Sequence, residues 1–166
     1  MLLWAGEISN ILALKQGAKE KLGDFGERVV RKLLENDGFD DFFQVQNKSS
    51  NGVDIVARNS KTGEVKVIEV KSSQQEAMWN NGNSPKKLPL SKDQQAGGKV
   101  YSKSRLGRAA NREDGWKNTP KATEQAELAQ EAIKDASAEG KVSYEKYDVY
   151  VDKSGGLRTA PKQRNW

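Results

Sequence analysis

The stretch from Gly52 to Ser73, GVDIVARNSKTGEVKVIEVKSS, constrains the fold more than any other part of the chain. It contains two runs rich in Val and Ile, which are separated by a Lys-Thr-Gly turn. β-Branched residues are favoured in strands, and Gly is favoured in the turns that connect them. The stretch therefore predicts two paired and largely buried strands. Three ionisable side chains lie within these runs and need a separate explanation: Asp54, Glu69 and Lys71.

The remaining pattern predicts a single α/β or α+β domain. Apolar residues recur at helical spacing from Leu22 to Asn36, with Asp24 as the expected N-cap. A second helix is expected at about 123–138, with Leu128 and Ile133 on its apolar side. Strands are expected at about 41–47, 53–58 and 64–71, followed by a C-terminal hairpin with a Gly-Gly turn at 144–160.

Residues 1–21 form a predicted helical lead-in to this domain. Their apolar run is interrupted by Glu7 and is far shorter than the roughly 20 residues of a membrane span. No basic residue precedes the run, so we do not expect a secretory signal.

The composition limits the chemistry that the chain can perform. Among its 166 residues there is no Cys and no His. This excludes thiolate nucleophiles, catalytic triads that contain histidine, and metal sites with cysteine or imidazole ligands. Catalysis would have to use carboxylates, amines, hydroxyls and an oxygen-preferring metal ion.

Positive charge is concentrated in the segment from Lys86 to Lys117, here called the basic segment. It contains nine basic and three acidic residues, whereas the rest of the chain has a net charge of −1. We expect a loop insertion with one helix starting near Ser91, either simply solvated or used to bind an anionic partner. The candidate phosphate-binding residues are Lys99, Lys103, Arg105 and Arg108, and Tyr101 and Trp116 are candidates for stacking on bases.

The ionisable residues of the two strands suit phosphodiester hydrolysis. Strand alternation directs Glu69 and Lys71 to one face, and the short turn allows Asp54 to approach the same end. A divalent cation would offset the cost of burying two carboxylates, and Lys71 would then orient or deprotonate the attacking water. The alternative is an ordinary Glu69–Lys71 ion pair on an exposed strand edge.

These residues resemble the PD-(D/E)xK nuclease superfamily, which has the restriction-endonuclease-like fold of a central mixed sheet flanked by helices. GDFGERVVRKLL resembles the first helix of the family, GVDIV its second strand and IEVKSS its third. The resemblance implies that residues 22–166 are the nuclease domain, that Asp54 and Glu69 bind Mg²⁺ or Mn²⁺, and that Lys71 acts on the nucleophile. By the same resemblance, Glu27 completes the metal shell directly or through water, and Gln95 is a polar residue on the following helix that faces the site. The proline of the motif is missing.

The added residues beyond this core resemble the architecture of a C-terminal toxin domain from a bacterial contact-dependent or polymorphic toxin. This implies delivery into the cytoplasm of a target bacterium and a cognate immunity protein in the producing cell. We favour DNA over tRNA as the substrate, because the basic segment is long enough to embrace a duplex. Two other classes stay open: a non-catalytic nucleic-acid-binding module and an adaptor that contacts an acidic protein.

Overall fold

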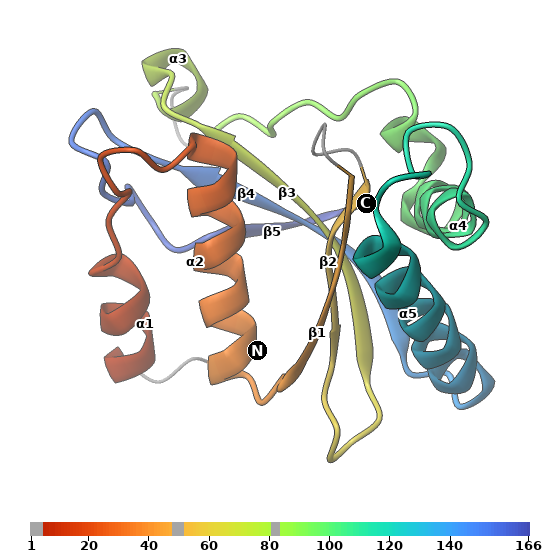
Figure 1. The fold of residues 1–166 in the computed structure, drawn as a ribbon. Coiled ribbons are helices and arrows are strands. Elements are labelled where there is room, and N and C mark those ends of the chain that lie inside the picture. Colours follow the sequence, from red (N-terminus) through yellow and green to blue (C-terminus); the bar gives the residue numbers. More distant parts are fainter. Residues whose placement is uncertain (1–4, 48–51, 81–83) are drawn as a thin grey trace. The chain divides into compact units, whose positions relative to one another are not determined.

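A computed structural model describes residues 5–47, 52–80 and 84–166 (Figure 1). The start of the apolar lead-in, residues 2–4, lies outside the described residues. In chain order the elements are α1 (Ala5–Leu12), α2 (Leu22–Asn36), β1 (Asp41–Gln46), β2 (Gly52–Arg58), β3 (Val65–Ser73), α3 (Glu76–Trp79), the 3₁₀ turn η1 (Gln94–Ala96), α4 (Gly98–Ala110), α5 (Pro120–Ala138), β4 (Val142–Tyr150) and β5 (Lys162–Asn165).

The five strands form one mixed sheet in the order β1-β2-β3-β4-β5. β2 pairs antiparallel with both β1 and β3. β3 and β4 run parallel, because Val65 N donates to Lys141 O at 2.9 Å and, further along, Val151 N donates to Ser73 O at 2.9 Å. The predicted mixed sheet with accompanying helices is therefore confirmed.

The chain divides into two compact units. Unit 1 contains Met1–Asp37, Val70–Leu90 and Lys146–Asn165, and unit 2 contains Gly38–Glu69, Ser91–Glu145 and Trp166. Both boundaries within the sheet fall inside a strand, one in β3 and one in β4. The expected lead-in helix, α1, is part of unit 1, as is α2.

The core of unit 2 lies between strands rich in valine and two helices. Figure 1 shows α5 beside β1, with α4 next to α5. α5 presents alanines to the sheet, and these small side chains allow a helix to lie close to the strands. Trp116, in the connection between the helices, is 2% exposed and fills the same core. The buried cluster comprises Phe43, Val45, Val53, Val56, Val65, Val67, Leu106, Ala109, Trp116, Ala122, Ala126, Ala129, Ala132 and Ala136.

The turn between β2 and β3 fixes the register of these two strands. The side-chain oxygen of Asn59 accepts hydrogen bonds from Lys61 N at 3.0 Å and Thr62 N at 3.2 Å. Gly63 has φ +76°, a conformation that favours glycine, and its N–H donates to Asn59 O at 2.8 Å. Because a shift by one residue would move every side chain to the opposite face, this turn determines which residues enter the core.

α2 contributes the main buried helical face of unit 1. Phe25, Val29, Val30 and Leu34 on this helix are fully buried. The helix begins after Lys21, which makes no side-chain capping bond, so the expected N-cap at Asp24 is wrong. Asp24 instead lies in the first turn, where a negative charge interacts favourably with the helix dipole. The helix ends at Asn36, where the helical spacing in the sequence also ends, and Asp37 is its C-cap.

A buried ionic network in unit 1 joins β4 to the segment that follows α3. Asp148 is fully buried and accepts hydrogen bonds from Lys146 Nζ, from Leu88 N at 3.0 Å and from Arg164 Nε at 3.2 Å. Lys146 also donates to Leu88 O at 2.6 Å. The buried charges therefore have several partners each, as buried ions require.

α5 differs from its predicted apolar stripe at one position. Leu128 is 42% exposed, because the buried face consists of the alanines together with Thr123.

Among the described residues, no helix has both the length and the apolar character needed to cross a membrane.

Replacing Asn59 with alanine should destabilise the protein by about 1–3 kcal/mol, because two turn N–H groups lose their acceptor. Equilibrium urea unfolding measures this change. Asn118→Ala, at an exposed position between α4 and α5, is the matched control and should change stability by no more than about 0.5 kcal/mol. Equal effects of the two substitutions would contradict the assigned role of the Asn59 side chain.

Candidate functional site

Asp54 and Glu69 occupy neighbouring backbone positions in unit 2. The paired residues of β2 and β3 run from Arg58↔Val65 to Ile55↔Ile68. Asp54 and Glu69 are the next residues on the two strands. Opposed residues of antiparallel strands have Cα atoms about 4.5–5.5 Å apart. The structure thus places the two acidic residues that the sequence singled out at opposed strand positions.

A β-bulge affects the direction of Asp54. On the other side of β2, Phe43 pairs with Val56 and Val45 pairs with Val53. Two residues of β2, Asp54 and Ile55, therefore lie opposite Gln44 alone. A bulge of this kind interrupts strand alternation and redirects a side chain, and such bulges are common beside active sites.

Each carboxylate accepts a hydrogen bond from a glutamine amide. Gln46 Nε2 donates to Asp54 Oδ1 at 3.4 Å, and Gln94 Nε2 donates to Glu69 Oε1. Asp54 is half-buried, whereas Glu69 is only 2% exposed. A buried carboxylate needs such donors, because water is no longer available to solvate it.

Two further hydrogen bonds fix the position of Gln94, one at its side chain and one at its backbone. Its side-chain oxygen accepts from Ser91 N at 2.9 Å, and its backbone oxygen accepts from Trp166 Nε1 at 3.2 Å. The Trp166 ring lies on Gly98, where a Cβ would come within 2.7 Å of the indole. It also packs against the Tyr101 ring, with 5.8 Å between the two ring centroids. The C-terminal Trp166 thus helps to fix the glutamine that contacts Glu69.

From the sequence, the adjacent residue, Gln95, was predicted to be the polar side chain at the site. Gln95 is exposed, whereas Gln94 is buried and contacts Glu69. A sequence signal for Gln94 was present: Ser91 and Gln94 have the Ser-x-x-Gln spacing of a capping box. Both bonds of that motif occur, since Gln94 N also donates to Ser91 Oγ at 3.4 Å.

Glu27 and Lys71 lie in unit 1 and flank a close contact between α2 and β3. At Gly26 a Cβ would lie 1.9 Å from Ser72 Oγ and 3.2 Å from Ser72 Cβ, so the helix and the strand approach closely here, and a larger residue would displace the serine hydroxyl. Glu27 follows Gly26 on the helix, and Lys71 precedes Ser72 on the strand. This contact places the two positions near each other. Their roles in catalysis stay predictions.

The donor set suits one class of metal ion. Mg²⁺ and Mn²⁺ prefer oxygen ligands, and Mg²⁺ commonly uses only one or two protein carboxylates, with water and phosphate oxygens completing its shell. Asp54 and Glu69 fit this requirement. Within residues 5–47, 52–80 and 84–166, no three acidic side chains gather into a metal-binding group. Direct ligation by Glu27 as a third carboxylate therefore stays a prediction.

The basic segment is more ordered than expected. The helix expected near Ser91 is α4, which begins later, at Gly98, after the 3₁₀ turn η1; Lys99 and Lys103 are exposed on it. Arg105 pairs with Asp93 at 2.8 Å, and Arg108 pairs with Glu113 at 3.4 Å. The two arginines are thus partly neutralised by the segment's own acids.

The two aromatic residues proposed to stack on bases do not present their rings to solvent. Trp116 belongs to the core of unit 2, and Tyr101 is only 9% exposed. The Tyr101 hydroxyl donates to Gly52 O at 3.2 Å, at the start of β2. The sequence prediction was wrong here because large aromatic rings in a polar segment contribute to the core when a helix covers the sheet.

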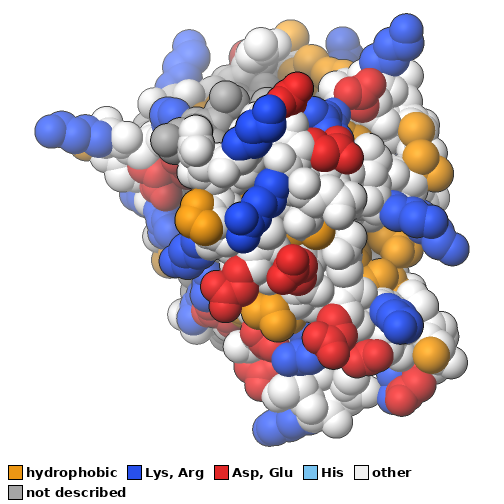
Figure 2. Space-filling model, turned by 45° about the vertical axis from the view of Figure 1, so that its right-hand side comes forward, with side chains coloured by type: hydrophobic (Ala, Val, Ile, Leu, Met, Phe, Trp, Pro, Cys, Tyr) orange, Lys and Arg blue, Asp and Glu red, His pale blue; other side chains and the backbone are white. Residues whose placement is uncertain are grey.

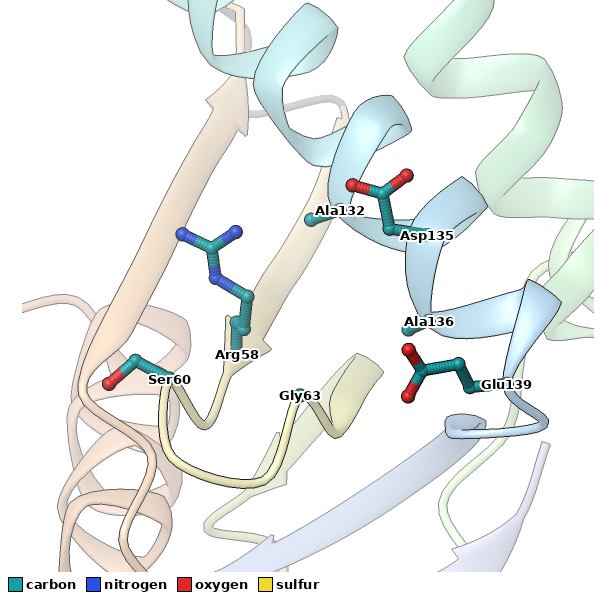
Figure 3. A pocket seen from close by; sticks show the side chains of 7 residues that line it. All are labelled: Arg58, Ser60, Gly63, Ala132, Asp135, Ala136 and Glu139. Atoms are coloured by element: carbon teal, nitrogen blue, oxygen red, sulfur yellow. The ribbon is translucent and has the colours of Figure 1, made fainter.

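A hollow of about 330 Å³ lies at the other end of β2, between the β2–β3 turn and the end of α5 (Figure 3). Arg58 lines it from β2, Asp135 from α5, and Glu139 from the position that follows α5. Arg58 is four residues from Asp54, or about 13 Å along a strand. Arg58 also pairs with Asp41, and Glu139 pairs with Lys141 at 2.8 Å. This hollow is therefore separate from the carboxylate pair.

Comparison with protein families gives a match to a family described as restriction endonuclease over residues 21–83. The match covers 63 of the 166 residues, including Glu27, Asp54, Glu69 and Lys71. It confirms the resemblance to restriction-endonuclease-like nucleases over that segment. No curated protein matches the chain.

Among solved structures, one match is SfsA from Pyrococcus furiosus in complex with Ca²⁺. The identity is 17% and the TM-score is 0.29, with 87% of this chain and 62% of that chain covered. The chain thus spans less than two thirds of the length of SfsA, and a likeness this weak supports no conclusion.

Replacing Gln94 with alanine should lower the free energy of unfolding by about 1–3 kcal/mol, because the buried Glu69 carboxylate loses a donor. Gln95→Ala, at the exposed neighbouring position, is the comparison variant and should cost less than Gln94→Ala. Chemical denaturation of the two variants in chelator measures both effects. A larger loss for Gln95→Ala would overturn the assignment of Gln94 as the supporting residue.

Proposed function

We propose that this protein is a metal-dependent endonuclease of the restriction-endonuclease type that hydrolyses phosphodiester bonds in DNA. The observation that carries the proposal is the placement of Asp54 and Glu69 at adjacent positions, immediately beyond the last paired residues of β2 and β3. The family match over residues 21–83 supports the same chemistry.

Two like charges at opposed strand positions destabilise a sheet, so a pair of acids here favours a bound cation. Asp54 and Glu69 would hold Mg²⁺ or Mn²⁺, with Gln46 and Gln94 fixing the orientation of the two carboxylates. When bound, such an ion supplies a Lewis acid that polarises the phosphodiester and lowers the pKa of a coordinated water.

Lys71 follows Glu69 by two residues, so strand alternation directs both side chains to one face of β3. We assign its amine to the attacking water: Nζ orients the water or accepts its proton, and in the protonated form it offsets the charge that builds up on the phosphate. Glu27, beside the close α2–β3 contact, would complete the metal shell, directly or through a water molecule.

We further propose, on the sequence architecture alone, that the domain acts as a toxin in the cytoplasm of a target bacterium and is blocked by an immunity protein. The description of the matching family favours DNA as the substrate. A tRNase on the same fold is the alternative.

The purified protein should nick plasmid DNA in Mg²⁺ or Mn²⁺ and should lose this activity in excess chelator. Asp54→Asn, Glu69→Gln and Lys71→Met should each reduce cleavage by about 10²–10⁴-fold, because each removes a group that acts on the reacting atoms. The effects should not add, since the residues act as one unit. Gel analysis of nicked and linear plasmid gives the rates.

Glu131→Gln and Lys61→Met are the matched controls, since both side chains are exposed and lie away from the carboxylate pair. Both should cleave at wild-type rates. Mg²⁺ should raise the thermal unfolding midpoint of the wild type but not that of Asp54→Asn, because only a bound ligand stabilises the native state. Full cleavage in chelator would refute the metal site, and wild-type rates for Lys71→Met would refute the role of its amine.

Expression of the domain in bacteria tests the substrate and the proposed toxicity together. We expect loss of stained nucleoids in cells that express the wild type, and intact nucleoids in cells that express Glu69→Gln. Fluorescence microscopy and gel analysis of total RNA are the measurements. Intact chromosomes with shortened tRNA would favour the tRNase alternative, and normal growth with active enzyme would argue against a toxin.

A further inference from the structure

A groove of about 410 Å³ runs between α4 and α5 in unit 2, with β4 contributing to its lining. α4 presents Lys99, Lys103 and Leu106 to the groove, at the i, i+4, i+7 spacing of one helical face. α5 presents Ile133 and Lys134. The groove is therefore built by facing sides of two helices rather than by a loop.

The charge in this groove is of one sign. Lys99, Lys103 and Lys134 line it, and no acidic side chain is among the described lining residues. On the face of the molecule seen in Figure 2, by contrast, acidic and basic side chains are mixed. Arg105 and Arg108, which are also on α4, are paired with Asp93 and Glu113. A cleft lined by charges of a single sign concentrates ligands of the opposite sign.

The interior of the groove is apolar. Leu106 is 2% exposed, and Ile133 and the Tyr144 ring pack against the same hydrophobic core. Burial raises the pKa of the Tyr144 hydroxyl, so this group remains protonated at neutral pH and can donate a hydrogen bond. An aromatic ring with aliphatic neighbours can accept the flat face of a base.

We propose that the groove binds one unpaired nucleotide of the nucleic-acid substrate, with the base against Leu106, Ile133 and Tyr144 and the flanking phosphates against the three lysines. The choice of nucleic acid rests on the proposed nuclease function. The volume lies within the range of about 300–1,000 Å³ that is typical of small-ligand pockets. An α-helix from a protein partner is about 10–12 Å across and would need a longer surface.

The groove begins close to the carboxylate pair along the chain. Gln94 contacts Glu69, η1 ends at Ala96, and Lys99 lies in the first turn of α4. Glu69 and the first groove residue are therefore linked through one short segment, residues 94–99. Lys134, on α5, was not a candidate in the sequence and joins this site only through the packing of the two helices.

The test measures binding of fluorescein-labelled oligothymidylate by anisotropy, in chelator so that no cleavage occurs. Lys103→Glu/Lys134→Glu should weaken binding at least tenfold and flatten the salt slope by about 1.4, the value for two lost contacts to a single strand. Lys61→Glu/Lys121→Glu makes the same charge change at exposed positions outside the groove and should weaken binding less than threefold. Unfolding midpoints equal to that of the wild type confirm that both variants fold.

The base contact is tested with an abasic oligonucleotide of equal length. The wild type should bind it less tightly than oligothymidylate, and Ile133→Ala should weaken binding of oligothymidylate only. A duplex should bind less tightly than the single strand, because a nucleotide must first be unpaired and unstacked before it can enter the groove.

Equal binding by the groove and control variants would overturn the proposal, as would equal affinity for the abasic and normal strands. Groove-dependent binding of polyglutamate but not of oligothymidylate would assign the groove to an acidic protein instead. Because the readout is binding without metal, it separates the two proposals. Groove-dependent binding without cleavage in Mg²⁺ would refute only the nuclease, and cleavage without groove dependence would refute only the groove.

Discussion

The register of β2 against β3 is the constraint on which the rest of unit 2 depends. Asn59 and Gly63 set this register in the turn, and it places Val56 and Val67 opposite each other within the core. The same register brings Asp54 and Glu69 level with each other at the far end of the two strands. A slip of one residue would expose the valines and separate the acids, so folding and the candidate site are determined by one pairing.

The carboxylate pair destabilises the folded state, and hydrogen bonds from neighbouring residues offset part of that cost. Adjacent like charges at strand positions are unfavourable, and burial of Glu69 adds a desolvation cost. Gln94 offsets part of this cost by donating to Glu69, and a capping box with Ser91 and the indole of Trp166 hold Gln94 in place. Such an arrangement is typical of functional sites, where local stability is lost in exchange for chemistry.

In the basic segment, tertiary structure decides which basic and aromatic side chains are buried or paired and which stay exposed, a difference that the sequence does not show. Its aromatic residues Tyr101 and Trp116 are buried, and two of its arginines are paired with acids in the same segment. Lys99 and Lys103 remain available on one face of α4, where they meet Lys134 of α5. The net charge of +6 on the basic segment therefore overstates the number of its cationic side chains that can contact an anionic ligand.

By itself, the sequence determined the order of the main elements, the β2–β3 hairpin and the resemblance to restriction-endonuclease-like nucleases, because strand and helix periodicity and short motifs are local properties of the chain. It also singled out Asp54, Glu69 and Lys71 as polar residues in apolar strands. Only the tertiary structure selected Gln94 rather than Gln95, since helix phase decides which of two adjacent side chains is buried. It alone revealed the bulge at Asp54 and joined Lys134 to the basic segment, because both depend on pairing between residues far apart in the chain.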